Sequence, residues 1–239
     1  MSVSRFLEAV SLSNKYQNSD TKEASLQDKR KFSRLFITIS REAGAGSINI
    51  GKKLAEFLNS DKTVNWPCPW TVFDKELIKT VLEDHHLPER WEKYMPEDKH
   101  SKIQDILDEL FGLHPASIVL VHRTSETILH LAQIGNVILV GRGASIITRK
   151  LEWGFHVRLV GSLRKRTQRV MEFSKVDKTQ AEELIAKWDK GRKKYLNEYF
   201  NKNIDDPLLY DLIINTDFVS HDNAAKIIAN AALCSRREN

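Results

Sequence analysis

The sequence predicts an α/β fold, in which a parallel β-sheet carries helices on both faces. Five short apolar segments recur along the chain, near residues 37, 72, 137, 156 and 213, with helical stretches between them. A glycine-bearing loop directly follows the first segment. Alternation of strands and helices favours a parallel sheet, because each crossover helix has to cover one face. The length of 239 residues suits one domain with insertions.

The composition is that of an ordinary soluble protein, with 41% hydrophobic and 29% charged residues. The longest purely apolar runs, such as 137–140, are far too short to span a membrane. We expect no signal peptide, because polar residues interrupt the N-terminal apolar positions. Cys68 and Cys234 have no metal-ligand spacing, so we expect reduced thiols and a cytoplasmic location without membrane partners.

Residues 1–33 are polar and predict a weakly ordered arm. One short amphipathic helix fits its apolar positions, which are Phe6, Leu7, Val10 and Leu12. Such a helix would dock on the body of the protein or on a second subunit, so a homodimer is one expected assembly.

The first structured unit is a strand over 36–40, a loop with Gly44 and Gly46, and a helix that runs to residue 58. Glycines let backbone N–H groups converge, and the helix N-terminus adds a partial positive charge. The unit therefore predicts a phosphate site, although no lysine follows Gly46 directly.

The middle of the chain continues the alternation. A strand over 71–73 precedes Asp74, which either caps the next helix or contacts a metal-bound water or an acceptor. Helices are expected within 75–117 and over 118–131. The strand over 136–140 leads directly into a glycine-rich turn around Arg142.

The last third predicts two more strands and three helices. A strand over 155–160 is followed by Ser162, a good N-cap for a basic helix. The remaining expected elements are a long helix over 178–201, a strand over 212–215 and a helix over 222–233.

Basic residues concentrate in the segment 149–194, which carries fourteen Lys or Arg against six acids, a balance of +8. Such a segment indicates a polyanion or a multiply phosphorylated ligand, or it is a solvated helix face.

Four motifs together resemble the cytidylate kinase-like family, a branch of the P-loop nucleoside monophosphate kinases. They are Ser40-Arg41-Glu42-Ala43-Gly44-Ala45-Gly46, Phe73-Asp74-Lys75-Glu76-Leu77-Ile78, Val140-Gly141-Arg142-Gly143-Ala144 and Leu209-Tyr210-Asp211-Leu212-Ile213-Ile214-Asn215-Thr216. The resemblance implies a P-loop NTPase fold over 34–239. It also implies a helical acceptor-binding insertion at about 75–117 and an arginine-bearing lid at about 163–205.

The phosphate loop can be placed in two frames. The run from Gly46 to Lys52 matches the spacing G-x-x-x-x-G-K, but it puts the lysine inside the helix. A loop that begins directly after the strand instead puts Ser47 at the lysine position and Ile48 at the hydroxyl position, and we prefer this frame. The expected nucleotide-binding residues are Arg41, Gly44, Ala45, Gly46, Ser47, Ile48, Asn215 and Thr216. Asn215 and Thr216 line a base pocket or cap the final turn.

Because the loop lacks its lysine, the resemblance implies that arginines elsewhere in the chain supply the positive charge for the phosphates. Arg142 would bind the acceptor phosphate, or it is a structural ion-pair partner. Arg166 and Arg169 lie one turn apart and would reach the transferring phosphoryl group, or they are solvated charges. Asp189 and Arg192 resemble a second lid pair. For Arg41, we expect a partial substitute for the missing lysine.

The implied activity is transfer of a phosphoryl group from ATP, with Mg²⁺, to a small acceptor such as cytidine monophosphate. Asp74 and Arg142 would contact the acceptor, and no metal ligand is assigned. Two alternatives stay open: a nucleotide- or phosphate-binding protein that has lost catalysis, and, less expected, a nucleic-acid-binding module based on the basic segment.

Overall fold

The computed structural model of the protein describes residues 34–62, 64, 66–74 and 119–235. The predicted N-terminal arm (1–33) and the predicted helical insertion (75–117) lie outside the described residues.

The described strands form one parallel sheet in the order β2-β3-β1-β4-β5. Their bounds are β1 Phe36–Arg41, β2 Thr71–Phe73, β3 Val137–Val140, β4 Gly154–Val160 and β5 Leu212–Asn215. The central strand β1 pairs with β3 and β4, so that Phe36 lies opposite Val137 on one side and Gly154 on the other. The predicted parallel sheet is confirmed, and each strand matches its prediction to within one residue.

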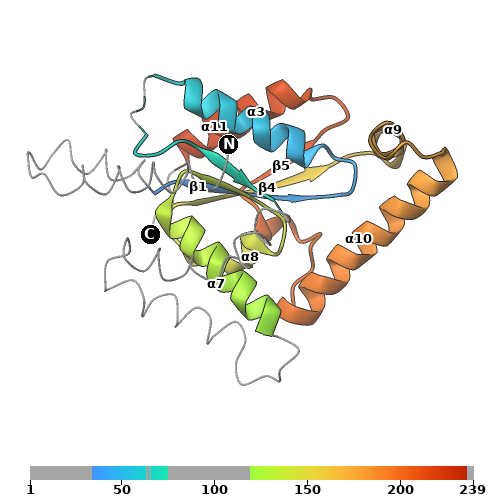
Figure 1. Cartoon of the computed structure of the whole chain (residues 1–239), viewed down its shortest axis with the longest axis horizontal. Coiled ribbons are helices and arrows are strands. Elements are labelled where there is room, and N and C mark those ends of the chain that lie inside the picture. The colour runs from blue at the N-terminus through green and yellow to red at the C-terminus, as the bar shows by residue number, and fades with distance from the viewer. Residues whose placement is uncertain (1–33, 63, 65, 75–118, 236–239) are drawn as a thin grey trace, which may run out of the picture.

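Helices cover both faces of this sheet (Figure 1). Figure 1 shows α3 and α11 above the sheet and α7 and α8 below it, with α9 and α10 at the side. The bounds are α3 Ser47–Ser60, α7 Val119–Ile134, α8 Ala144–Ile147, α9 Leu163–Ser174, α10 Lys178–Phe200, the 3-10 turn η2 Pro207–Leu209 and α11 His221–Cys234.

The core forms on both sides of β1, because alternate side chains of a strand point to opposite faces. Ile37 and Ile39 are buried in the cluster that contains the apolar residues of α3 and α11. Phe36 belongs to the cluster on the other face, with residues of α7 and α8. Both faces of β1 are therefore packed, and the candidate site lies where β1 and β3 end.

Local capping signals fix the helix starts. Ser162 accepts a hydrogen bond from the Lys165 backbone N–H and caps α9, as predicted. Asp177 caps α10 with a reciprocal contact to Gln180, which completes a capping box. Helix α11 begins one residue before the prediction, because Ser220 accepts from the Asn223 N–H and acts as its N-cap.

Both cysteines are free thiols, Cys68 buried and Cys234 exposed. Burial raises the pKa of the Cys68 thiol to about 12, so this residue stays protonated. Among the described helices, none is both long and apolar enough to cross a bilayer.

Candidate functional site

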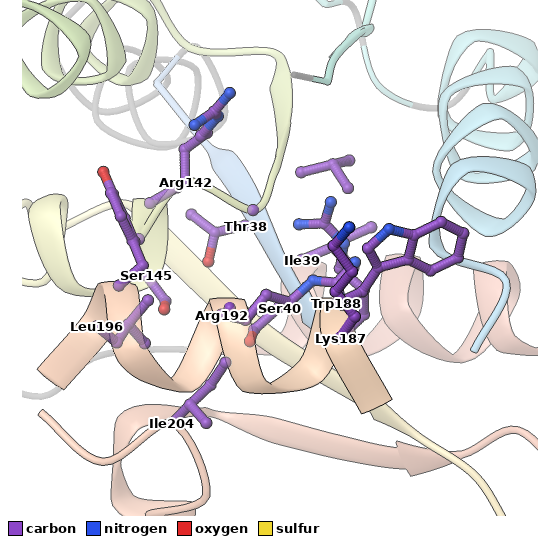
Figure 2. Close-up of a pocket in the computed structure, with 17 residues that line it drawn as sticks. Thr38, Ile39, Ser40, Arg142, Ser145, Lys187, Trp188, Arg192, Leu196 and Ile204 are labelled. Carbon is purple, nitrogen blue, oxygen red and sulfur yellow. The ribbon is translucent and has the colours of Figure 1, made fainter. Parts of the chain in front are cut away.

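A cavity of about 620 Å³ opens at the carboxyl ends of β1 and β3 (Figure 2). This is the edge of a parallel sheet at which ligands bind. Helix α10 forms the opposite wall, so the cavity lies between the sheet and the segment predicted as a lid. The described lining residues are Thr38, Ile39, Ser40, Arg41, Val140, Gly141, Arg142, Gly143, Ala144, Ser145, Lys187, Trp188, Gly191, Arg192, Tyr195, Leu196 and Ile204.

The glycine loop connects β1 to α3, in the frame that begins directly after the strand. Gly44 and Gly46 have positive φ, 76° and 82°, which favours glycine at both positions. Helix α3 begins at Ser47, so Gly51 and Lys52 lie within the helix. No side chain caps α3 and no acid lies in its first turn, so its first amides and its dipole favour an anion.

Three polar side chains from α9 and α10 contact the backbone of this loop. Arg166 Nη1 donates to the Ala43 carbonyl at 3.2 Å, and Arg169 Nη1 donates to the Gly44 carbonyl at 3.3 Å. Asp189 Oδ1 accepts from the Ala43 N–H at 2.8 Å. The prediction that Arg166 and Arg169 face the same side of their helix is therefore confirmed, and that side is the glycine loop.

Both of these arginines are bound to protein oxygens in the structure. Arg166 is buried, donates from Nε to the Gly161 carbonyl and pairs with Asp189 at 2.7 Å. Arg169 donates to the carbonyl and hydroxyl oxygens of Thr216, at 2.6 and 3.0 Å. Arg166 and Arg169 are thus not the solvated charges of the alternative interpretation.

The cavity itself is lined by a second group of arginines, Arg41, Arg142 and Arg192, together with Lys187. Burial lowers the pKa of Arg41 to about 10, and the like charges of Arg192 and Arg142 add to this shift, while Asp74 opposes it. Burial likewise lowers the pKa of Arg192, which donates from Nη1 to Asp189 Oδ1 at 3.1 Å. Like charges held this close in a partly buried site favour binding of an anion.

Arg142 lies in a strained turn. Its φ of 54° is left-handed, between Gly141 at 85° and Gly143 at 73°. This conformation is uncommon for a residue with a Cβ and is often found at functional sites. Within the described part of the chain, Arg142 has no ion-pair partner. Figure 2 shows Arg142 and Arg192 coming from different walls, the β3–α8 turn and α10.

Arg41 lies on the cavity side of its strand. Its guanidinium packs against Gly141, where a Cβ atom would overlap it. The sequence assigned Arg41 to the donor loop as a substitute for lysine. The structure places its side chain in the cavity that Arg142 and Arg192 also line.

The other predicted site residues occupy different positions. Asp74 directly follows β2, and the helix that it was expected to cap lies outside the described residues. Asn215 accepts a hydrogen bond from the Asp217 N–H, and Thr216 is buried and donates to the Val160 carbonyl. Neither Asn215 nor Thr216 lines the cavity. Their contacts fit the turn-capping alternative.

Sequence reasoning did not identify two residues at the glycine loop. The imidazole of His221 covers Gly46, where a Cβ atom would overlap it. Burial lowers the pKa of His221, and Arg169 and Lys53 add to this shift. Glu42 accepts from the Gly161 N–H at 3.0 Å. No spacing rule links these residues to their partners, which are more than a hundred positions away in the sequence.

The described residues fit ATP better than they fit Mg²⁺, the two cofactors that the resemblance implies. The uncapped first turn of α3 fits the polyphosphate of ATP. Ile48 offers no oxygen at the end of the loop, and across the described residues no group of three His, Cys, Asp or Glu side chains converges as a metal site. No converging three-residue metal site is therefore present among the described residues, and no step is assigned to the metal.

Comparison with known proteins agrees with the fold. Residues 36–218 match the model of the cytidylate kinase-like family. The cytidylate kinase of Methanocaldococcus jannaschii is 25% identical over 199 residues, which is 82% of this chain and 97% of that protein. The cytidylate kinase of Pyrococcus horikoshii is 26% identical over 200 residues, or 83% and 88% of the two chains. A crystal structure of an uncharacterized protein from Eubacterium ventriosum superposes with a TM-score of 0.64 at 26% identity, and covers 83% of this chain and 98% of that one.

Proposed function

Because the chain belongs to the cytidylate kinase-like family, we propose that it transfers the γ-phosphoryl group of ATP to a small acceptor that itself carries a phosphate. Cytidine monophosphate is the first candidate, since two curated relatives are cytidylate kinases. The observation that carries the proposal is the group Arg41, Arg142 and Arg192 in one cavity beside an uncapped glycine loop.

The chain's groups divide the work between donor and acceptor. The first-turn amides of α3 bind donor phosphate oxygens, and the three cavity arginines hold the acceptor phosphate. An acceptor oxygen attacks the γ-phosphorus, and the bond to the β-phosphate oxygen breaks to release ADP. A phosphate oxygen is already anionic, so this attack needs no general base. This fits the described lining, which contains no Asp, Glu or His.

The test is ADP release, measured with MgATP and a panel of nucleoside monophosphates. We expect release that depends on one acceptor. Arg41→Lys and Arg142→Lys should each raise the acceptor KM about tenfold or more, because lysine cannot bind a phosphate bidentately. Arg164→Lys is the matched control, since Arg164 is exposed on α9. Absence of ADP with every acceptor, together with an unchanged Arg142→Lys variant, would contradict the proposal.

The second candidate is a nucleotide-binding protein without catalysis. It is favoured by Ile48 at the hydroxyl position and by the protein contacts that occupy Arg166. Under this alternative, ATP at a hundred times its Kd would stabilise the fold by about 2.7 kcal/mol without any ADP release. A melting temperature that does not respond to ATP would exclude it.

A further inference from the structure

Four side chains of alternating charge form a continuous line from the glycine loop to the cavity. Glu42 Oε2 lies 3.4 Å from Arg166 Nε. Arg166 Nη1 lies 2.7 Å from Asp189 Oδ2, and Arg192 Nη1 lies 3.1 Å from Asp189 Oδ1. The line begins next to Arg41 on β1 and ends at a cavity arginine on α10.

Glu42 holds the base of the lid segment at two points. Besides its contact with Arg166, its Oε2 atom accepts the Gly161 N–H, in the connection that leads from β4 into α9. Ala43, the next residue, packs with Val170 of α9 and with Ala181 and Ile185 of α10. The glycine loop and the two helices therefore form one packed unit.

Asp189 is the junction of this unit. It accepts from the Ala43 N–H, from Arg166 and from Arg192, so one carboxylate orients the loop and two guanidinium groups. Removal of one charge from such a network leaves the neighbouring charge without its partner. The neighbour's remaining contacts, and the orientation of the next side chain in the line, then change as well.

We propose that Glu42 is a positioning residue that sets the orientation of Arg192, and hence acceptor affinity, through Arg166 and Asp189. Its effect on Arg192 is independent of turnover, while the effect on acceptor affinity rests on the proposed function. In this arrangement Arg166 acts as a link between the loop and α10, and Arg192 is the member of the line that faces the cavity.

The test is hydrogen exchange of the full chain without ligand, compared between the wild type and Glu42→Gln. Glutamine keeps an oxygen for the Gly161 N–H and removes the charge that faces Arg166. We expect amide exchange in α10 around Asp189 to rise at least threefold, while α11 stays unchanged. Glu172→Gln is the matched control, because Glu172 is exposed on α9 and accepts a hydrogen bond from Gln168 of the same helix. If amide exchange in α10 is the same in Glu42→Gln as in Glu172→Gln, the proposal is overturned.

A double variant separates a line of charges from independent local effects. Asp189→Asn alone should raise α10 exchange at least as much as Glu42→Gln. The double variant should then exchange no faster than Asp189→Asn alone, since both changes break the same line. Additive effects overturn the proposal. If Glu42→Gln does not fold, Arg166→Lys is used in its place in the same comparison. Lysine keeps the positive charge at position 166 but lacks the guanidinium N–H groups that contact Gly161 and Asp189.

Kinetics supply the functional readout. Glu42→Gln should raise the acceptor KM at least fivefold with a smaller change in the donor KM. If the acceptor KM and the donor KM rise equally, the proposed effect on acceptor affinity is overturned. Exchange that responds as expected in a protein that releases no ADP would support the line of charges and contradict the proposed function, so the two failures are distinguishable.

Discussion

Arg166 and Arg169 connect α9 to the glycine loop, because each donates from its guanidinium group to a backbone carbonyl of the loop. A spacing of three places both side chains on one side of α9, and both do contact the glycine loop. Their partners were not predictable, because Glu42 and Thr216 are brought to α9 by other strands of the sheet. The sequence identified the arginines, whereas the fold determines whether each faces a carbonyl, a carboxylate or the cavity.

Gly141 tests the placement of Arg41 without changing an arginine. We expect Gly141→Ala to raise the acceptor KM about tenfold, because its Cβ would overlap the Arg41 guanidinium. It should also lower the free energy of unfolding by about 1–2 kcal/mol, since alanine is strained at positive φ. Acceptor kinetics and denaturant unfolding measure the two effects.

Gly143→Ala is the matched control for this variant. Gly143 has a similar φ of 73°, but a Cβ there would meet the ring of Phe200. We expect a comparable loss of stability with a smaller change in acceptor KM. Equal KM values for the two variants would argue against a role for Arg41 at the acceptor.

At the scale of elements, prediction succeeded where a local pattern decides the structure. The run of β-branched residues in β3 and the serine before α9 gave the correct elements. The start of α11 was misplaced by one residue, because Ser220 acts as its N-cap by accepting from the Asn223 N–H, so that His221 is already helical. The contact of α11 with the glycine loop through His221 has no local signature.

We expect this contact to make the stability of the fold depend on pH. The pKa of His221 is lowered by burial, by Arg169 and by Lys53, with Asp222 opposing them. The unfolded chain therefore binds the proton more readily, and the free energy of unfolding should fall as the pH drops below about 6.5. His221→Gln should reduce this fall, by at most about 1.4 kcal/mol per pH unit.

Thermal unfolding of the wild type and of His221→Gln between pH 8 and 5 measures this loss of stability. The value of each protein at pH 8 is its baseline. Parallel curves for the wild type and His221→Gln would show that the imidazole at Gly46 does not resist protonation.

At the scale of the whole molecule, many residues of the basic segment 149–194 pair with carboxylates of the same chain. Among its fourteen basic residues, those that form ion pairs with described carboxylates include Arg149, Arg158, Arg166, Lys178, Arg192, Lys193 and Lys194. Arg158 and Arg166 are also buried. The amino-acid composition could not distinguish a phosphate site from a nucleic-acid-binding surface, because it does not show which basic side chains pair with carboxylates.

We therefore expect the ligand to be a small anion and not a polynucleotide. We expect a labelled single-stranded oligonucleotide to show no saturable binding below about 10 µM at physiological salt, since non-specific affinity depends on unpaired cations that contact successive phosphates. Fluorescence anisotropy across a salt series measures this, and ATP with the acceptor should raise the melting temperature under the same conditions. Submicromolar oligonucleotide binding that persists at this salt would instead assign the remaining surface cations to a nucleic acid.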